Sequence, residues 1–148
     1  MKPDVPVALQ KLSLSLLLEI GPAISVDYLQ RGAGIAAMML QMAAEEWDRA
    51  AARRAEENAA LRALFRDAST AVGDAALAAR LRAAADGADD DLRVSALERA
   101  NRELRGLLVA LHEHVETLRS PEARRLEAAI WAELRRSTER RALPLAPF

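Results

Sequence analysis

The most constraining feature of this sequence is a run of residues between positions 94 and 118 that recur at alternating intervals of three and four. This spacing places every member on one side of an α-helix, whereas a β-strand would need a two-residue period. We therefore predict a long helix whose apolar stripe must be covered by other helices. The stripe consists of Val94, Leu97, Asn101, Leu104, Leu108, Leu111, Val115 and Leu118.

Asn101 is the one polar member of this stripe. A buried Asn at such a position can fix the register and the number of strands of a coiled coil, so the stripe is a candidate contact in a homodimer. Arg93 and Glu98 occupy positions that would pair across a parallel dimer. Leu107 widens the stripe beyond a strict coiled-coil seam, which is typical of a bundle core. The sequence leaves both arrangements open, a contact between subunits and packing within the chain.

The composition indicates an all-α protein. Of the 148 residues 33 are Ala, the strongest helix former, and aromatic residues make up only 3%. Because residues that suit strands are scarce, helices packed on helices are favoured over a sheet. The length fits a single helical domain over 1–148. The sequence contains no Cys, which excludes disulfides, thiolate nucleophiles and Cys-ligated metal sites within it.

The same periodicity extends to the rest of the chain and predicts a helical bundle of about five helices, with long second and fourth helices. Gly21 and Pro22 should stop or kink the first helix. The expected helices cover residues 6–20, 28 onward, 75–85, 92–118 and 121–141, followed by an extended tail over 142–148.

The second of these helices is apolar on most of its circumference between Tyr28 and Ala44, which is typical of a helix in the middle of a bundle. Near Arg54, polar residues replace the apolar ones on the face that should pack against other helices. The helix either continues past this point or breaks there. Unbroken to Phe65 it would be roughly 60 Å long, which is long for one domain, and a partner could cover its far end.

Two motifs that suggest bound cofactors are incomplete. Gly32, Gly34 and Ala37 match the G-x-G-x-x-A form of the dinucleotide fingerprint. A second strand should follow that motif, but residues 47–57 are charged, rich in Ala and helical in pattern. A di-iron bundle needs an E-x-x-H pair, which this sequence lacks.

Other candidate metal-binding and catalytic groups are also incomplete. His112 and Glu116 lie four residues apart and could form half a metal site, but His114 is rotated away from them by about 200°. Glu45 and Glu46 are adjacent on a helix and therefore do not face one another. We predict no catalytic, cofactor-binding or metal-binding residue, and we expect no cofactor and no enzymatic activity.

Charge and hydropathy restrict the partners and the location. The 21 basic and 22 acidic residues give a net charge of −1, which argues against nucleic acid as a partner. The apolar run 33–44 is shorter than the ~20 residues that span a membrane. The Leu-rich run 12–18 is interrupted and lacks a following cleavage site, so we expect a cytoplasmic protein. The excess of Ala and Arg is typical of a GC-rich bacterial genome.

Three segments between Leu16 and Phe65 resemble uncharacterised bacterial all-helical accessory proteins that are encoded near acyl-CoA dehydrogenases and phosphotransferase-like enzymes. The segments are LLLEIGPA, YLQRGAGIAAMMLQMAAEEW and RAEENAALRALF. The resemblance covers about a third of the chain. It implies an accessory role beside a metabolic enzyme and carries over no catalytic residue.

Taken together, the sequence predicts a non-enzymatic helical interaction or accessory protein that associates with itself through helix packing and that could bind a metabolic enzyme. An alternative is a bundle that binds a small apolar ligand or an acyl chain. In that case Met38, Met39 and Met42 would line the cavity, because Met adapts to irregular apolar ligands.

Overall fold

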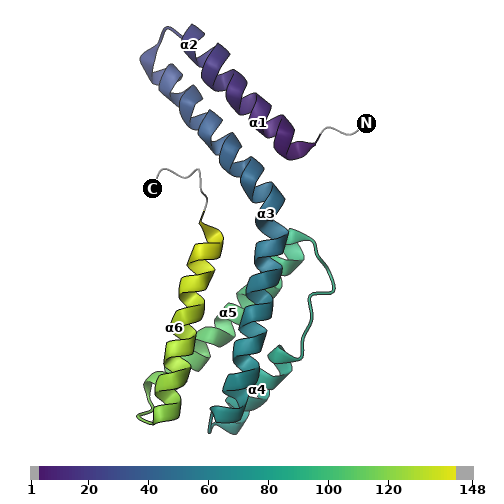
Figure 1. The fold of residues 1–148 in the computed structure, drawn as a ribbon, viewed down its shortest axis with the longest axis vertical. Coiled ribbons are helices and arrows are strands. Elements are labelled where there is room, and N and C mark those ends of the chain that lie inside the picture. The colour runs from purple at the N-terminus through teal and green to yellow at the C-terminus, as the bar shows by residue number, and fades with distance from the viewer. Residues whose placement is uncertain (1–3, 143–148) are drawn as a thin grey trace. The chain divides into compact units, whose positions relative to one another are not determined.

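The computed structural model describes residues 4–142, and every regular element in that range is a helix (Figure 1). Three elements, α1, η1 and α2, follow one another without a loop and form one helical run, so the described chain has five such runs. This confirms the all-α helical bundle with long second and fourth helices. The elements are α1 (Val5–Ser15), η1 (Leu16–Ile20), α2 (Gly21–Ala23), α3 (Asp27–Ala71), α4 (Ala75–Ala85), α5 (Val94–Glu116) and α6 (Pro121–Arg141).

The first helical run widens into a π-turn, η1, just before Pro22. Pro22 has no N–H to donate within the helix, and the N–H of Gly21 reaches back five residues to the carbonyl of Leu16. A Cβ atom at Gly21 would lie 2.8 Å from that carbonyl oxygen, so only glycine fits there without strain. Gly21 and Pro22 thus distort this helix, which ends three residues later than expected, at Ala23.

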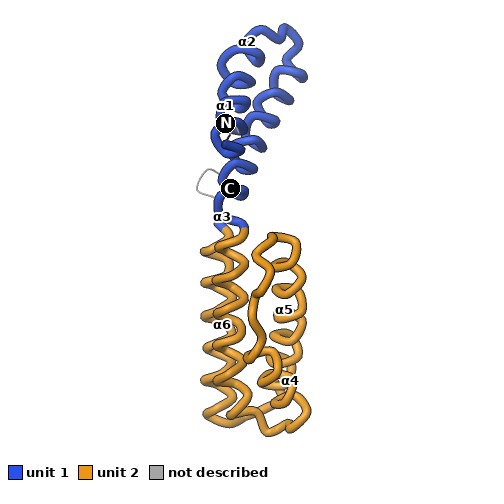
Figure 2. Tube along the Cα trace, turned by 90° about the vertical axis from the view of Figure 1, so that its right-hand side faces the viewer, with its two compact units in different colours: residues 1–50, 142–148 blue, residues 51–141 orange. Residues whose placement is uncertain are grey.

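The described chain divides into two compact units (Figure 2). Of the described residues, unit 1 comprises 4–50 and Ala142, and unit 2 comprises Ala51–Arg141. The single domain over 1–148 expected from length stays a prediction. The boundary between the two units lies within α3, whose 45 residues continue unbroken past Arg54. Apart from Ala142, the tail expected at 142–148 lies outside the described residues.

Unit 2 has a continuous apolar core to which all four of its helices contribute. Leu61 and Phe65 of α3 pack with Leu81 of α4, Leu111 of α5 and Ile130 of α6, and all five are almost completely buried. The helix ends follow local signals. The Asp74 side chain accepts a hydrogen bond from the N–H of Leu77 at 2.9 Å, and the Ser120 hydroxyl accepts one from Ala123 at 3.1 Å. Both caps satisfy backbone donors that the first helical turn leaves free.

Unit 1 is a helical hairpin in which the run α1–α2 returns along the first half of α3 (Figure 1). Its buried residues are small. The Ser13 hydroxyl donates to the carbonyl oxygen of Ala37 at 2.8 Å, and Gly21, Ala37 and Ala44 complete the contact. Small residues let the two helices approach closely, but they bury little apolar surface.

Two helical glycines provide a matched pair of variants that test the packing around them. Gly106 lies in the middle of α5, where an added Cβ would meet nothing within 4 Å. We expect Gly106→Ala to raise the free energy of unfolding by about 0.5–1 kcal/mol, because Ala loses less backbone entropy. Gly21→Ala should instead lower it by about 1–3 kcal/mol through the clash with Leu16. Urea unfolding followed by circular dichroism measures both, and a destabilising Gly106→Ala would contradict the packing around α5.

Candidate functional site

A buried polar network crosses unit 2 and includes Asn101. The Nδ2 of Asn101 donates to the Oδ1 of Asn58 on α3 at 2.9 Å, and both side chains are buried. The Nδ2 of Asn58 in turn donates to the backbone oxygen of Leu97 at 3.3 Å and to both carboxylate oxygens of Asp89 at 3.2 Å. Asn101 therefore finds its partner within the chain, on the neighbouring helix.

Glu57 is the central charge of this network and is only 2% exposed. Its Oε1 accepts hydrogen bonds from Arg105 of α5 at 2.8 Å and from the Ser137 hydroxyl of α6 at 2.9 Å. Its Oε2 accepts two from the guanidinium of Arg141, at 2.7 and 3.1 Å. Burial alone would raise the pKa of Glu57, but the hydrogen bonds from Arg141, Ser137 and Arg105 outweigh it and lower the pKa.

Asp89 holds the loop between α4 and α5 against α3. Arg62 donates to its two carboxylate oxygens at 2.9 and 2.7 Å, in the bidentate geometry that gives the strongest ion pairs. This pair lowers the pKa of Asp89, and the hydrogen bond from Asn58 adds to the effect. A second buried carboxylate, Glu133 on α6, pairs with Arg136 and Arg140 of its own helix.

The stripe proposed as a subunit contact lies mostly inside unit 2. Six of its members are buried by the chain's own helices, namely Leu97, Asn101, Leu104, Leu108, Leu111 and Val115, while Val94 and Leu118 at its two ends are exposed. Leu107 is buried beside them, so the stripe is as wide as a bundle core requires. A second copy could reach these six residues only if the bundle opened.

Unit 1 presents the opposite arrangement, with its large apolar residues outside. The apolar residues that it buries are three alanines, Ala37, Ala44 and Ala50, whereas thirteen large apolar side chains of its described residues are at least 37% exposed. Unit 2 has more residues than unit 1 but exposes only five large apolar side chains to this extent. The thirteen are Val5, Val7, Leu12, Leu14, Leu17, Leu18, Ile20, Val26, Tyr28, Leu29, Ile35, Met39 and Trp47.

Of the three Met residues of the alternative hypothesis, Met39 belongs to this exposed surface. Met39 is exposed, and Met38 and Met42 are partly buried. None of the three lines the pocket within unit 1 or the groove in unit 2. The pocket within unit 1 measures about 180 Å³ and is lined by Leu16, Leu17, Gly21, Pro22, Gln30 and Gly34.

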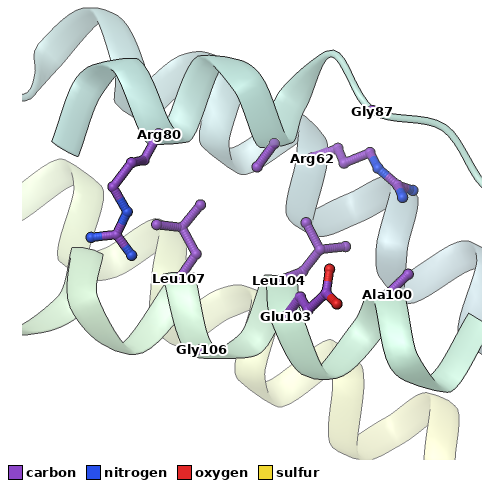
Figure 3. Close-up of a pocket in the computed structure, with 9 residues that line it drawn as sticks. Arg62, Arg80, Gly87, Ala100, Glu103, Leu104, Gly106 and Leu107 are labelled. Carbon is purple, nitrogen blue, oxygen red and sulfur yellow. The ribbon is translucent and has the colours of Figure 1, made fainter. Parts of the chain in front are cut away.

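A groove of about 550 Å³ lies between α4 and α5 in unit 2 (Figure 3). Leu104 and Leu107 form part of its floor, and Arg80 and Glu103 extend beside them. Arg62 at the other end is already engaged by Asp89. The groove thus combines an apolar floor with one cation and one anion, and its lining residues hold no nucleophile beside a general base.

The other candidate groups of the sequence are placed as follows. The His112 Nε2 lies 3.6 Å from an oxygen of Glu116, and its ring packs edge-on against Trp131. Within residues 4–142 no three His, Cys, Asp or Glu side chains come together as a metal site. Gly32 and Gly34 lie inside α3 and form no turn. None of the described helices combines the length and apolarity needed to cross a bilayer.

The paired carboxylates of Glu57, which is buried, and Asp89, which is partly buried, predict how the stability of unit 2 depends on pH. Glu57 and Asp89 have lower pKa values in the folded protein than their ordinary 4.5 and 3.8. Their contribution is therefore fully present above these ordinary values and is lost as the pH falls through the lower folded-state values. We expect the free energy of unfolding to decrease steadily below about pH 4.5.

Glu57→Gln tests this assignment. At pH 7 it should lower the free energy of unfolding by about 2–4 kcal/mol, because Arg141 and Arg105 lose their charged acceptor. Lowering the pH should then reduce the free energy of unfolding of the variant by less than it reduces that of the wild type. Glu56→Gln, at the exposed neighbouring position, is the control and should keep the wild-type profile. Urea unfolding between pH 3 and pH 7 compares the three, and an unchanged acid dependence in Glu57→Gln would contradict an ionised Glu57.

Comparison of this protein with protein-family models, with curated proteins and with solved structures found no match.

Proposed function

We propose that this chain is a non-enzymatic helical interaction protein that associates with itself through helix packing. One observation carries the proposal. Unit 1 buries alanine, serine and glycine between its two helices and leaves thirteen large apolar side chains exposed. A helix that is apolar on most of its circumference is stable in water when other helices cover it, and a hairpin supplies one neighbour for each helix.

The magnitude of the exposed surface supports this proposal. Thirteen such side chains, each roughly half exposed, present on the order of 1,000 Å² of apolar surface, distributed over the hairpin. Burying one of them completely contributes about 1.5–3 kcal/mol. Because each is already about half buried, covering all thirteen would contribute roughly 10–20 kcal/mol, compared with the about 4–15 kcal/mol that association costs.

Unit 2 is suited to a supporting role in such an assembly. Its apolar core is complete, and the buried polar groups of Glu57, Asn58 and Asn101 all have partners within it. It can therefore keep its fold while unit 1 exchanges partners. The resemblance of residues 16–65 to bacterial accessory proteins supports a cytoplasmic metabolic enzyme as a further partner.

The solution mass tests self-association. We expect light scattering to give a mass near twice 16.1 kDa at high concentration, falling towards the monomer on dilution. Asn101→Leu should change the stability of unit 2 and leave this mass unchanged, because Asn101 lies in the closed bundle. A monomer at every concentration, with its helical content intact, would overturn the proposal. A change of mass in Asn101→Leu would return the contact to the α5 stripe.

A further inference from the structure

One side of the unit 1 hairpin carries apolar residues at the spacing of a helical bundle. On α1 and η1 these are Val5, Leu9, Leu12 and Leu16, at intervals of four, three and four. On α3 the same alternation continues through Leu29, Ala33, Ala36, Leu40, Ala43 and Trp47. Intervals of three and four keep each stripe on one side of its helix over several turns.

The contact between α1 and α3 shows that the two stripes lie on the same side of the hairpin. Ser13 faces α3 through its hydrogen bond to Ala37, and Ala37 and Ala44 face α1. One residue turns a helix by about 100°, so Leu12 lies to one side of Ser13 and Leu14 to the other. In an antiparallel pair, the residue before each contact position lies on the same side of both helices. Leu12 therefore shares a side with Ala36 and Ala43.

The ten positions of these two stripes include no ionisable residue. We call them the uncharged face. The opposite side of the hairpin carries charges as well as apolar residues. Leu14 and Met38 follow the contact positions Ser13 and Ala37, but Glu45 follows Ala44, and Arg31 and Arg49 continue that side of α3. Trp47 is 64% exposed at one end of the uncharged face, and Leu12 is 57% exposed near its middle.

The chemistry of the uncharged face favours a second copy of this chain over a lipid surface. The described part of unit 1 has six acidic and only three basic side chains, and membrane-surface helices need the reverse to bind anionic lipids. Stable interfaces take roughly 800 Å² from each partner, so a dimer through this face would have to bury the whole of it. An interface core without charges is typical of homodimers, while transient partners meet through more polar surfaces.

We propose that the uncharged face of unit 1 binds the same face of a second copy, so that two hairpins form a four-helix bundle. A two-fold axis would pair each stripe with its symmetry mate, and the alternation of three and four matches the packing of such bundles. Large residues then fill the centre of the bundle, and the alanines allow the helices to approach. This inference rests on the self-association proposed above and assigns it to one face.

Trp47 can report on this face directly. The sequence has two Trp residues, and Trp131→Phe leaves Trp47 as the remaining one. We expect the Trp47 emission to move to shorter wavelength and its quenching by acrylamide to fall, over the same concentration range in which the mass doubles. If the mass doubles while Trp47 stays accessible, the uncharged face is wrong and self-association still holds. If neither changes, both proposals fail.

Leu12 and Leu14 provide a matched pair of variants. They lie on the same helix with similar exposure, 57% and 50%, but on opposite sides of the hairpin. Leu12→Glu should raise the dimer dissociation constant by on the order of 100-fold, because two-fold symmetry buries two added carboxylates. Leu14→Glu should leave it within about threefold, as expected of a surface position. Circular dichroism confirms that both variants keep their helical content.

The remaining outcomes overturn the assignment in distinct ways. Loss of the dimer in Leu14→Glu, alone or together with Leu12→Glu, would show that the contact is not confined to the uncharged face. The Trp131→Phe chain mixed with vesicles of phosphatidylcholine and phosphatidylserine tests the membrane. A shift of the Trp47 emission with vesicles, in a chain that stays monomeric without them, would replace the second copy by a lipid surface.

Discussion

The buried carboxylate of Glu57 is the interaction on which the arrangement of unit 2 depends. A charge that is 98% removed from solvent is tolerated only when its oxygens are fully engaged, and here donors from two other helices meet it. Arg105 belongs to α5, while Ser137 and Arg141 belong to α6. The network thus fixes how these helices lie against α3, which an apolar core alone would specify less sharply.

Because α3 extends beyond unit 2, its first half forms part of unit 1. In unit 2 its large residues, such as Leu61 and Phe65, face the core, whereas in unit 1 only Ala37, Ala44 and Ala50 are buried. The first half of the helix meets one neighbouring helical run, and that run contributes Ser13 and Gly21 to the contact. Among the described residues, each helix of the hairpin packs against one neighbouring helical run, and this leaves much of its apolar surface exposed.

Local signals in the sequence were sufficient for several helix boundaries. The ranges 75–85 and 121–141 expected from the sequence match the observed bounds of α4 and α6. The continuation of α3 past Arg54 could not be decided in this way. Glu57 and Asn58 stand at core positions, and polar residues there indicate an exposed surface or a break unless their partners are known. Those partners lie 31 to 84 residues away, so only the tertiary structure identifies them.

The candidate site shows the same limit of local reasoning. The spacing around Asn101 is compatible both with a subunit seam and with a bundle core, and its hydrogen-bond partner Asn58 lies 43 residues earlier, where local reasoning does not reach. Conversely, the apolar residues that cover most of the helix circumference after Tyr28 indicate a helix buried in a bundle. In the structure, several of these residues are exposed.

The two units therefore respond to different variables. The stability of unit 2 depends on the protonation of its buried carboxylates, whereas the stability of unit 1, if a second copy covers it, depends on protein concentration.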